Sequence, residues 1–227
     1  MKISLIIPFY IRRKLLQVHQ NYIWRRVIVD FESSILNNME ISSNLIQKLI
    51  YGWGNQGWSA HTGFLESCIK VSLTSERAIL ECGSGLTTVI VGIIAKKKGL
   101  TVISLEHNRK WADNVNNYLT KLNLTNVRIQ VVRIVDYDGY HWYDIKKSDI
   151  PTTFDMVICD GPPAQTQGGR YGLIPIMNMY FSKGTKILMD DTVRDDERVI
   201  IKKWKDMIPL QEEKINSTDL HSILTIL

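Results

Sequence analysis

The chain has 227 residues, of which 44% are hydrophobic and 22% charged, and its formal net charge is +5. This length suits one large domain with a real core, and the ordinary balance of apolar and charged residues excludes an intrinsically disordered chain. The basic excess is mild, so we read it as solvated helix faces and do not expect a nucleic-acid partner.

Three cysteines, Cys68, Cys82 and Cys159, lie within apolar segments and lack the spacing of metal ligands. They are typical of buried thiols in a reducing compartment. The apolar residues 3–10 are too few to cross a bilayer, and their basic cluster follows them, whereas a secretory signal has it in front. We therefore expect a cytoplasmic protein with no membrane span. Whether it forms a homodimer is left open.

Apolar residues recur at helical spacing between residues 11 and 50. This pattern indicates two or three helices that form an N-terminal cap or arm over residues 1–52, followed by the main domain over residues 53–227. The main domain opens with a loop over residues 53–61 that is rich in glycine and tryptophan. Such a loop is costly to order unless it contacts a ligand or the protein core, and both readings are kept.

A glycine-rich turn follows the first predicted strand of the main domain. Residues 77–82 form a short apolar run, Gly83 and Gly85 come next, and residues 89–98 predict a helix. Glycines permit a tight turn and let a ligand lie against the backbone at the helix N-terminus. Glu81 stands just ahead of the turn, where its carboxylate would repel a pyrophosphate and attract a cation. The turn therefore predicts a site for a cationic nucleoside-like ligand.

The next strands add two more acids. The strand over residues 101–105 stops at Glu106, 23 residues after Gly83, which is one strand–helix–strand step. A carboxylate at this point is placed to accept hydrogen bonds from ribose hydroxyls. After a third strand over residues 127–132, Asp136 is placed to hydrogen-bond an adenine ring.

Two further strands end in carboxylates. Asp160 follows the strand over residues 154–159, and Asp190 and Asp191 follow the strand over residues 187–189. Parallel strands place their carboxyl ends at one edge of the sheet, so these three side chains are expected to gather there. Clustered carboxylates need a cation, and Mg²⁺ is the natural candidate. The alternative is that these acids only cap the helices that follow them.

The order of these motifs over residues 53–204 resembles that of class I S-adenosylmethionine-dependent methyltransferases, whose first motif reads acid-x-Gly-x-Gly. Asp160 and Asp190 match metal ligands of the cation-dependent, catechol-type O-methyltransferases, whereas Asp191 replaces their usual asparagine. The run Asp-Gly-Pro-Pro from Asp160, with Arg170-Tyr171 and the later Asp-Asp pair, is more similar still to bacterial small-molecule and sugar methyltransferases.

The resemblance implies an α/β, Rossmann-like fold with a mostly parallel seven-stranded sheet and helices on both faces. We expect further helices over residues 172–182 and 193–205, and an antiparallel C-terminal strand over residues 222–227 paired near residues 211–215. The cofactor-binding residues so implied are Trp58, Ser59, Glu81, Gly83, Ser84, Gly85, Thr87, Thr88, Glu106, His107, Asp136, Tyr137 and Asp160. The implied metal ligands are Asp160, Asp190 and Asp191.

These assignments predict a methyltransferase that uses S-adenosylmethionine, with Mg²⁺ assistance left open, to methylate a hydroxyl of a small-molecule or sugar acceptor. The residues assigned to catalysis are Asp160, with His141 as an alternative general base, and Arg170, which either holds the substrate or braces Asp160. Two other functions are kept as alternatives: an NAD-dependent oxidoreductase and a non-catalytic domain that binds S-adenosylmethionine.

Overall fold

The computed structural model describes residues 8–55, 60–146, 150, 153–216 and 220–227. The chain divides into two compact units, Met1–Thr62 and Gly63–Leu227, whereas the sequence analysis placed the boundary at residue 52. Among the described residues, no helix is both long and apolar enough to cross a membrane. Trp58 and Ser59, two predicted cofactor contacts, lie outside the described residues.

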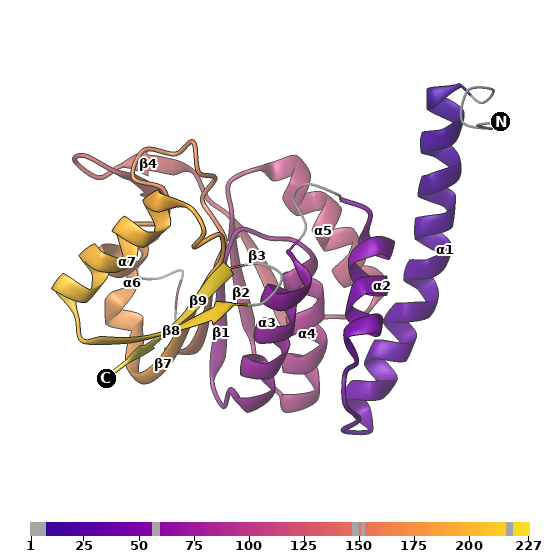
Figure 1. Ribbon diagram of the computed structural model, residues 1–227, viewed down its shortest axis with the longest axis horizontal. Helices are drawn as coiled ribbons and strands as arrows, with labels where there is room; N and C mark the ends of the chain where they lie inside the picture. The colour runs from indigo at the N-terminus through magenta and orange to yellow at the C-terminus, as the bar shows by residue number, and fades with distance from the viewer. Residues whose placement is uncertain (1–7, 56–59, 147–149, 151–152, 217–219) are drawn as a thin grey trace. The chain divides into compact units, whose positions relative to one another are not determined.

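The first unit is a pair of helices, α1 (Phe9–Leu36) and α2 (Ser43–Trp53), which agrees with the helices predicted between residues 11 and 50 (Figure 1). The Ser42 hydroxyl caps α2 by accepting a hydrogen bond from the Leu45 backbone N–H at 3.3 Å. The two helices approach closely at Gly52, where an added Cβ would lie 2.9 Å from the Trp24 backbone nitrogen. The Trp24 and Trp53 rings pack beside this contact, with centroids 5.5 Å apart.

The second unit is built on a seven-stranded sheet in the order β3-β2-β1-β6-β7-β9-β8. The first five strands in this order are mutually parallel, and β9 is antiparallel to both of its neighbours. The predicted mostly parallel sheet with an antiparallel C-terminal strand is therefore confirmed. The strands are β1 (Ala78–Cys82), β2 (Val102–Glu106), β3 (Val127–Val131), β6 (Phe154–Cys159), β7 (Phe181–Met189), β8 (Leu210–Asn216) and β9 (Leu220–Ile226).

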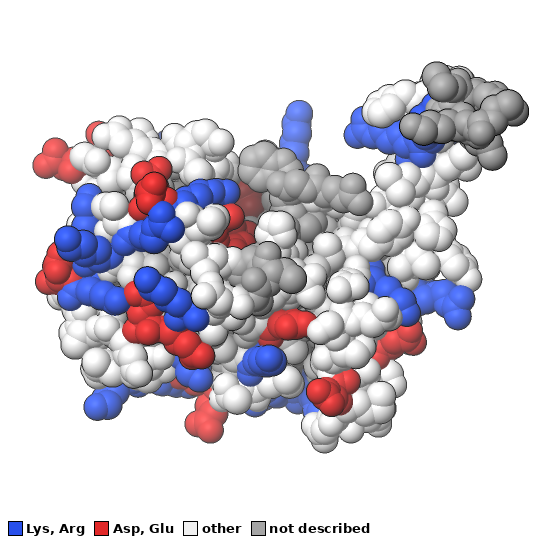
Figure 2. All heavy atoms as spheres, in the orientation of Figure 1, with Lys and Arg blue, Asp and Glu red and all other residues white. Residues whose placement is uncertain are grey.

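Helices cover both faces of this sheet. Figure 1 shows α3 (Thr62–Thr74), α4 (Leu86–Lys98) and α5 (Arg109–Lys121) on one side, and α6 (Leu173–Met177) and α7 (Asp195–Met207) on the other. Every residue of β1 is buried, as are the first ten residues of α4, so the turn that joins them is anchored in the core. Acidic and basic side chains are mixed over the visible surface of the second unit (Figure 2).

One segment differs from the sequence predictions, and another forms an element that was not predicted. The predicted helix over residues 172–182 is shorter, because Phe181 pairs with Phe154 in the sheet and β7 begins there, after α6 and a 3₁₀ turn (Asn178–Tyr180). The aromatic stretch after β4 (Ile134–Asp136) forms a strand, β5 (His141–Tyr143), which pairs with β4 in a separate two-stranded sheet. Cross-strand pairing thus overrides the helical pattern at residues 181 and 182.

Candidate active site

The turn between β1 and α4 combines a close backbone contact with an open space. Gly83 has φ +90°, and a Cβ added there would lie 3.1 Å from the Gly161 nitrogen, so the turns after β1 and β6 lie against each other. A Cβ added at Gly85 would meet no atom of the described residues within 4 Å. Gly85 therefore borders free space at the carboxyl edge of the sheet, and it lies at the N-terminus of a helix, where a polar ligand can bind backbone N–H groups.

Glu81 braces this turn from inside the core. Its fully buried carboxylate accepts hydrogen bonds from the hydroxyls of Thr87 at 2.5 Å, Thr88 at 2.6 Å and Ser104 at 2.7 Å. These bonds tie the end of β1 to the first turn of α4 and to β2, which is a structural role that the sequence analysis did not assign. The selection of a cationic ligand by Glu81 stays a prediction.

Burial raises the pKa of Glu81 from 4.5 to about 7, although its three hydroxyl partners oppose the shift. A carboxyl group whose pKa is raised on folding favours the folded state fully below pH 4.5, and this contribution is lost as the pH rises to about 7. The free energy of unfolding of the wild type should therefore fall between pH 5 and pH 8. We expect this fall to be about 3 kcal/mol smaller in Glu81→Gln, which cannot ionise. Urea unfolding at both pH values measures this difference. The exposed variant Glu213→Gln is the control and should follow the wild type; parallel curves for Glu81→Gln would contradict the assignment.

Glu106, at the end of β2, lies beside the glycine turn as predicted for a ribose ligand. Its Oε2 accepts hydrogen bonds from the Ser84 backbone N–H at 3.0 Å and the Ser84 hydroxyl at 2.8 Å, and its Oε1 accepts one from the Asn108 N–H at 2.8 Å. His107 Nδ1 lies 3.2 Å from Oε1. The Trp111 indole donates to the Ser84 carbonyl at 2.7 Å, so the turn is held from two sides.

The two-stranded sheet contributes a buried phenol that the sequence analysis missed. The Tyr143 hydroxyl is fully buried and has no hydrogen-bond partner among the described residues, and a Cβ at Gly161 would lie 2.5 Å from it. Burial raises the pKa of this phenol well above its usual value, and the nearby Glu106 and Asp160 carboxylates act in the same direction. A buried neutral hydroxyl near these two acids, without a partner among the described residues, is a candidate donor for a ligand.

The other predicted residues of this region lie on the same small sheet. Asp136 is exposed at the end of β4 and is the cross-strand partner of His141. The Tyr137 ring stacks on Tyr140 with centroids 5.8 Å apart, and its hydroxyl donates to the Tyr143 carbonyl at 3.2 Å. The adenine contact of Asp136 and the base role of His141 stay predictions.

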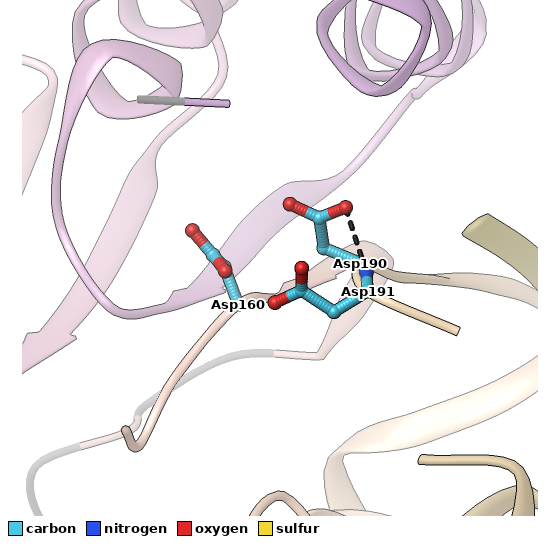
Figure 3. Close-up of side chains that lie close together, drawn as sticks. All are labelled: Asp160, Asp190 and Asp191. Atoms are coloured by element: carbon cyan, nitrogen blue, oxygen red, sulfur yellow. Dashed lines mark hydrogen bonds between the residues drawn. The ribbon is translucent and has the colours of Figure 1, made fainter. Parts of the chain in front are cut away.

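The predicted acid cluster is present at the carboxyl edge of the sheet (Figure 3). One carboxylate oxygen from each of Asp160, Asp190 and Asp191 lies within 4.8 Å of the others. Asp160 follows β6, and the Asp190–Asp191 pair follows β7, where Asp191 has φ +58° and its N–H donates to Asp190 Oδ1 at 2.8 Å. Asp191 does not cap α7, since the residue before that helix is Arg194.

Arg170 holds the cluster together. Its side chain is 4% exposed, and its Nη2 donates to Asp160 Oδ1 at 3.1 Å, to the Asp160 carbonyl at 3.0 Å and to Asp191 Oδ2 at 2.9 Å. Its Nη1 donates to the Asp190 carbonyl. This geometry favours bracing of Asp160 over the alternative role of Arg170, contact with a substrate.

The charges in this region do not balance among the described residues. A second arginine, Arg194, lies 3.0 Å from Asp191 and 3.5 Å from Glu197, which is itself buried and 4.0 Å from Arg170. Four carboxylates therefore share two guanidinium groups, an excess of two negative charges when all are ionised. Burial, followed by repulsion from Asp160 and Asp191, raises the pKa of Asp190 to about 8, and burial also raises the pKa of Asp160. Such a donor set fits a divalent cation.

No family model and no curated relative matches the sequence. The structure, in contrast, is similar to those of solved methyltransferases. A putative caffeoyl-CoA O-methyltransferase from Staphylococcus aureus has a TM-score of 0.57 and 14% identity, over 92% of this chain and 100% of that one. An O-methyltransferase from Bacillus cereus in complex with S-adenosylhomocysteine has a TM-score of 0.56 and 14% identity, over 94% of this chain and 99% of that one.

The similarity extends to a methyltransferase outside the O-methyltransferases. The C-terminal domain of precorrin-6Y C5,15-methyltransferase from Rhodobacter capsulatus has a TM-score of 0.53 and 12% identity, over 76% of this chain and 92% of that one. Together with the strand order, these matches confirm that the chain has the fold of class I S-adenosylmethionine-dependent methyltransferases.

Proposed function

We propose that this protein is an S-adenosylmethionine-dependent methyltransferase that methylates a hydroxyl oxygen of a small-molecule or sugar acceptor. The observation that carries the proposal is the space that the described residues leave open beside Gly85, on the same sheet edge as Glu106 and the carboxylates of Asp160, Asp190 and Asp191. A site for a nucleoside and a set of candidate proton acceptors thus adjoin within a fold that solved methyltransferases share.

The residues around the turn suit a sulfonium nucleoside. Glu106 would bind the ribose hydroxyls, the glycine turn that it holds through Ser84 would receive the amino-acid part, and the Tyr143 hydroxyl offers a further donor. None of these residues adds positive charge that would favour a pyrophosphate over a ribose or a sulfonium. When bound, S-adenosylmethionine supplies an electrophilic methyl group, and the protein has to align the acceptor oxygen with it.

Asp160 is the best-placed proton acceptor of the cluster. About a third of its side chain is exposed (34%), and Arg170 bonds its Oδ1, which leaves Oδ2 for an acceptor hydroxyl. Burial raises the pKa of Asp160 above its usual range, and a carboxylate whose pKa is closer to neutrality removes a proton more effectively. Arg170 keeps that carboxylate oriented.

The acid cluster would also hold a divalent cation, through Asp160, Asp190 and Asp191. A cation bound there would lower the pKa of an acceptor hydroxyl and neutralise the excess negative charge. The replacement of the usual asparagine by Asp191 is matched by two arginines, because Arg170 and Arg194 both lie within 3.0 Å of the Asp191 carboxylate.

Isothermal calorimetry and a transfer assay test the proposal. We expect S-adenosylhomocysteine to bind and NAD⁺ not to bind, and Glu106→Ala to weaken the affinity about ten- to a hundredfold through loss of charged hydrogen bonds. Glu213→Ala, at an exposed position of β8, is the matched control. Release of S-adenosylhomocysteine with phenolic or sugar acceptors then reports turnover, and EDTA in the same assay tests the cation. Binding of NAD⁺ alone would support an oxidoreductase, and binding without turnover of any acceptor would support a non-catalytic domain.

A further inference from the structure

Helix α1 carries two largely apolar faces, and only one of them packs against other described residues of its own unit. The first face packs on α2 and includes Gln20, Trp24 and Phe31, all buried. The second, which we call the exposed face, consists of Leu15, Val18, Tyr22 and Val29. These four side chains are 55% to 62% exposed. Large apolar side chains that recur along one line of a helix are unusual on a solvated surface.

The exposed face is a stripe along one line of the helix, with a gap of about two turns between Tyr22 and Val29. At about 100° per residue, Leu15, Val18, Tyr22 and Val29 fall within roughly 60° of one another, on the side of α1 opposite Trp24. Ile11, half-buried, extends the stripe by one turn at its N-terminal end. The stripe therefore covers more than four turns of the helix.

Basic side chains border the stripe on both sides. By the same geometry, Lys14 and Arg25 lie along one border and Arg12 and Arg26 along the other. The Arg26 Nη1 donates to the Tyr22 hydroxyl at 2.8 Å, so it lies directly at the stripe. No Asp or Glu occurs between Pro8 and Val29. In Figure 2, no red atoms are visible on the N-terminal half of α1.

We propose that the exposed face of α1 binds along the surface of an anionic lipid bilayer. The apolar stripe would enter the boundary between headgroups and acyl chains, and the bordering Lys and Arg side chains would reach the lipid phosphates. Charge complementarity favours this partner over a second copy of the chain, because two such faces would bring their basic borders together and place Arg25 near the seam. A nucleic acid would leave the apolar stripe exposed.

Vesicle flotation of the full chain tests the proposal. We expect the protein to float with vesicles of phosphatidylcholine mixed with phosphatidylglycerol, to stay behind with phosphatidylcholine alone, and to be released by salt. A basic variant, Lys14→Gln with Arg25→Gln and Arg26→Gln, should lower the partition coefficient about a hundredfold. An apolar variant, Leu15→Gln with Val18→Gln, should lower it at least about tenfold without changing the charge.

The matched control removes three exposed lysines from the second unit, Lys70→Gln with Lys202→Gln and Lys214→Gln, and should float like the wild type. Circular dichroism confirms that each variant is folded, and the basic variant tests the proposal even if the apolar one misfolds. The proposal is overturned if the wild type does not float with anionic vesicles, or if the control loses as much binding as the basic variant. Binding to RNA in place of vesicles, or a dimer that the apolar variant dissociates without any flotation, would assign the face to those partners instead.

Discussion

Asp160→Asn is expected to slow methyl transfer by about 10²- to 10⁴-fold, which is the range that a positioned general base contributes. The amide keeps the size of the side chain and can still accept the hydrogen bond from Arg170, but it cannot take a proton from an acceptor hydroxyl. The affinity for S-adenosylhomocysteine should change little, because Glu106 and the backbone of the glycine turn are untouched. Single-turnover rates and calorimetry on the same preparation separate the two effects.

The matched control for this experiment is Asp206→Asn, an exposed acid on α7 with the same chemical change. It should retain the wild-type rate. If Asp160→Asn also turns over at the wild-type rate, Asp160 takes no part in the chemistry, and His141 becomes the residue to replace. If instead S-adenosylhomocysteine binding is lost together with activity, Asp160 acts on the cofactor and not on the acceptor.

The sheet could be predicted from the sequence because its signals are local. Short apolar runs that end in an acid or a glycine mark β1, β2 and β6, and parallel strands bring such ends to one edge whatever the remaining residues are. The acid cluster was predictable for the same reason, since Asp160 and Asp190 each follow a buried strand. These conclusions required strand order, but no knowledge of side-chain contacts.

The interior of the site could not be predicted, because it depends on contacts between residues far apart in the sequence. Glu81 was predicted from its charge and position alone, whereas its three hydroxyl partners come from α4 and from β2. Tyr143 reaches the site because β4 and β5 pair. This pairing could not be predicted, since the sequence of residues 139–144 is equally compatible with a loop. The only local indication of a buried acid is the pair of hydroxyl groups at the start of the helix, Thr87 and Thr88, because hydroxyls can donate hydrogen bonds to a carboxylate.

Arg170 illustrates the same limit at the level of charge. Its neighbours in sequence are glycines and Tyr171, which suit a substrate-binding loop, yet its guanidinium is buried among groups from the ends of β6 and β7. The numbers of acidic and basic residues can be read from the sequence, but which of them form ion pairs cannot. In the structure one arginine serves the Asp160 and Asp191 carboxylates at once, and this pairing allows an acid at position 191.

Arg170→Met is therefore expected to lower the free energy of unfolding by about 3–5 kcal/mol at pH 8, the cost of removing one partner from a buried charge network. Methionine fills the space of the arginine stem but removes the Arg170 donors from the Asp160 and Asp191 carboxylates and from two carbonyls, and only Asp191 keeps a second arginine partner, Arg194. The loss should be smaller at pH 5. The raised pKa values of Asp160 and Asp190 mean that protonation there removes much of the uncompensated charge.

Arg198→Met provides the matched control, since Arg198 pairs with Asp195 on the surface of α7 and should cost no more than about 1 kcal/mol. Arg170→Lys keeps the charge but not the forked geometry, so it should recover only part of the stability. Urea unfolding of the three variants at pH 5 and pH 8 measures these differences.

Equal stabilities for Arg170→Met and Arg198→Met would mean that the carboxylates are held apart without the guanidinium. In that case added Mg²⁺ should raise the free energy of unfolding of both variants equally. If Arg170 does hold the cluster, Mg²⁺ should stabilise Arg170→Met more than Arg198→Met, because the cation then replaces the missing positive charge.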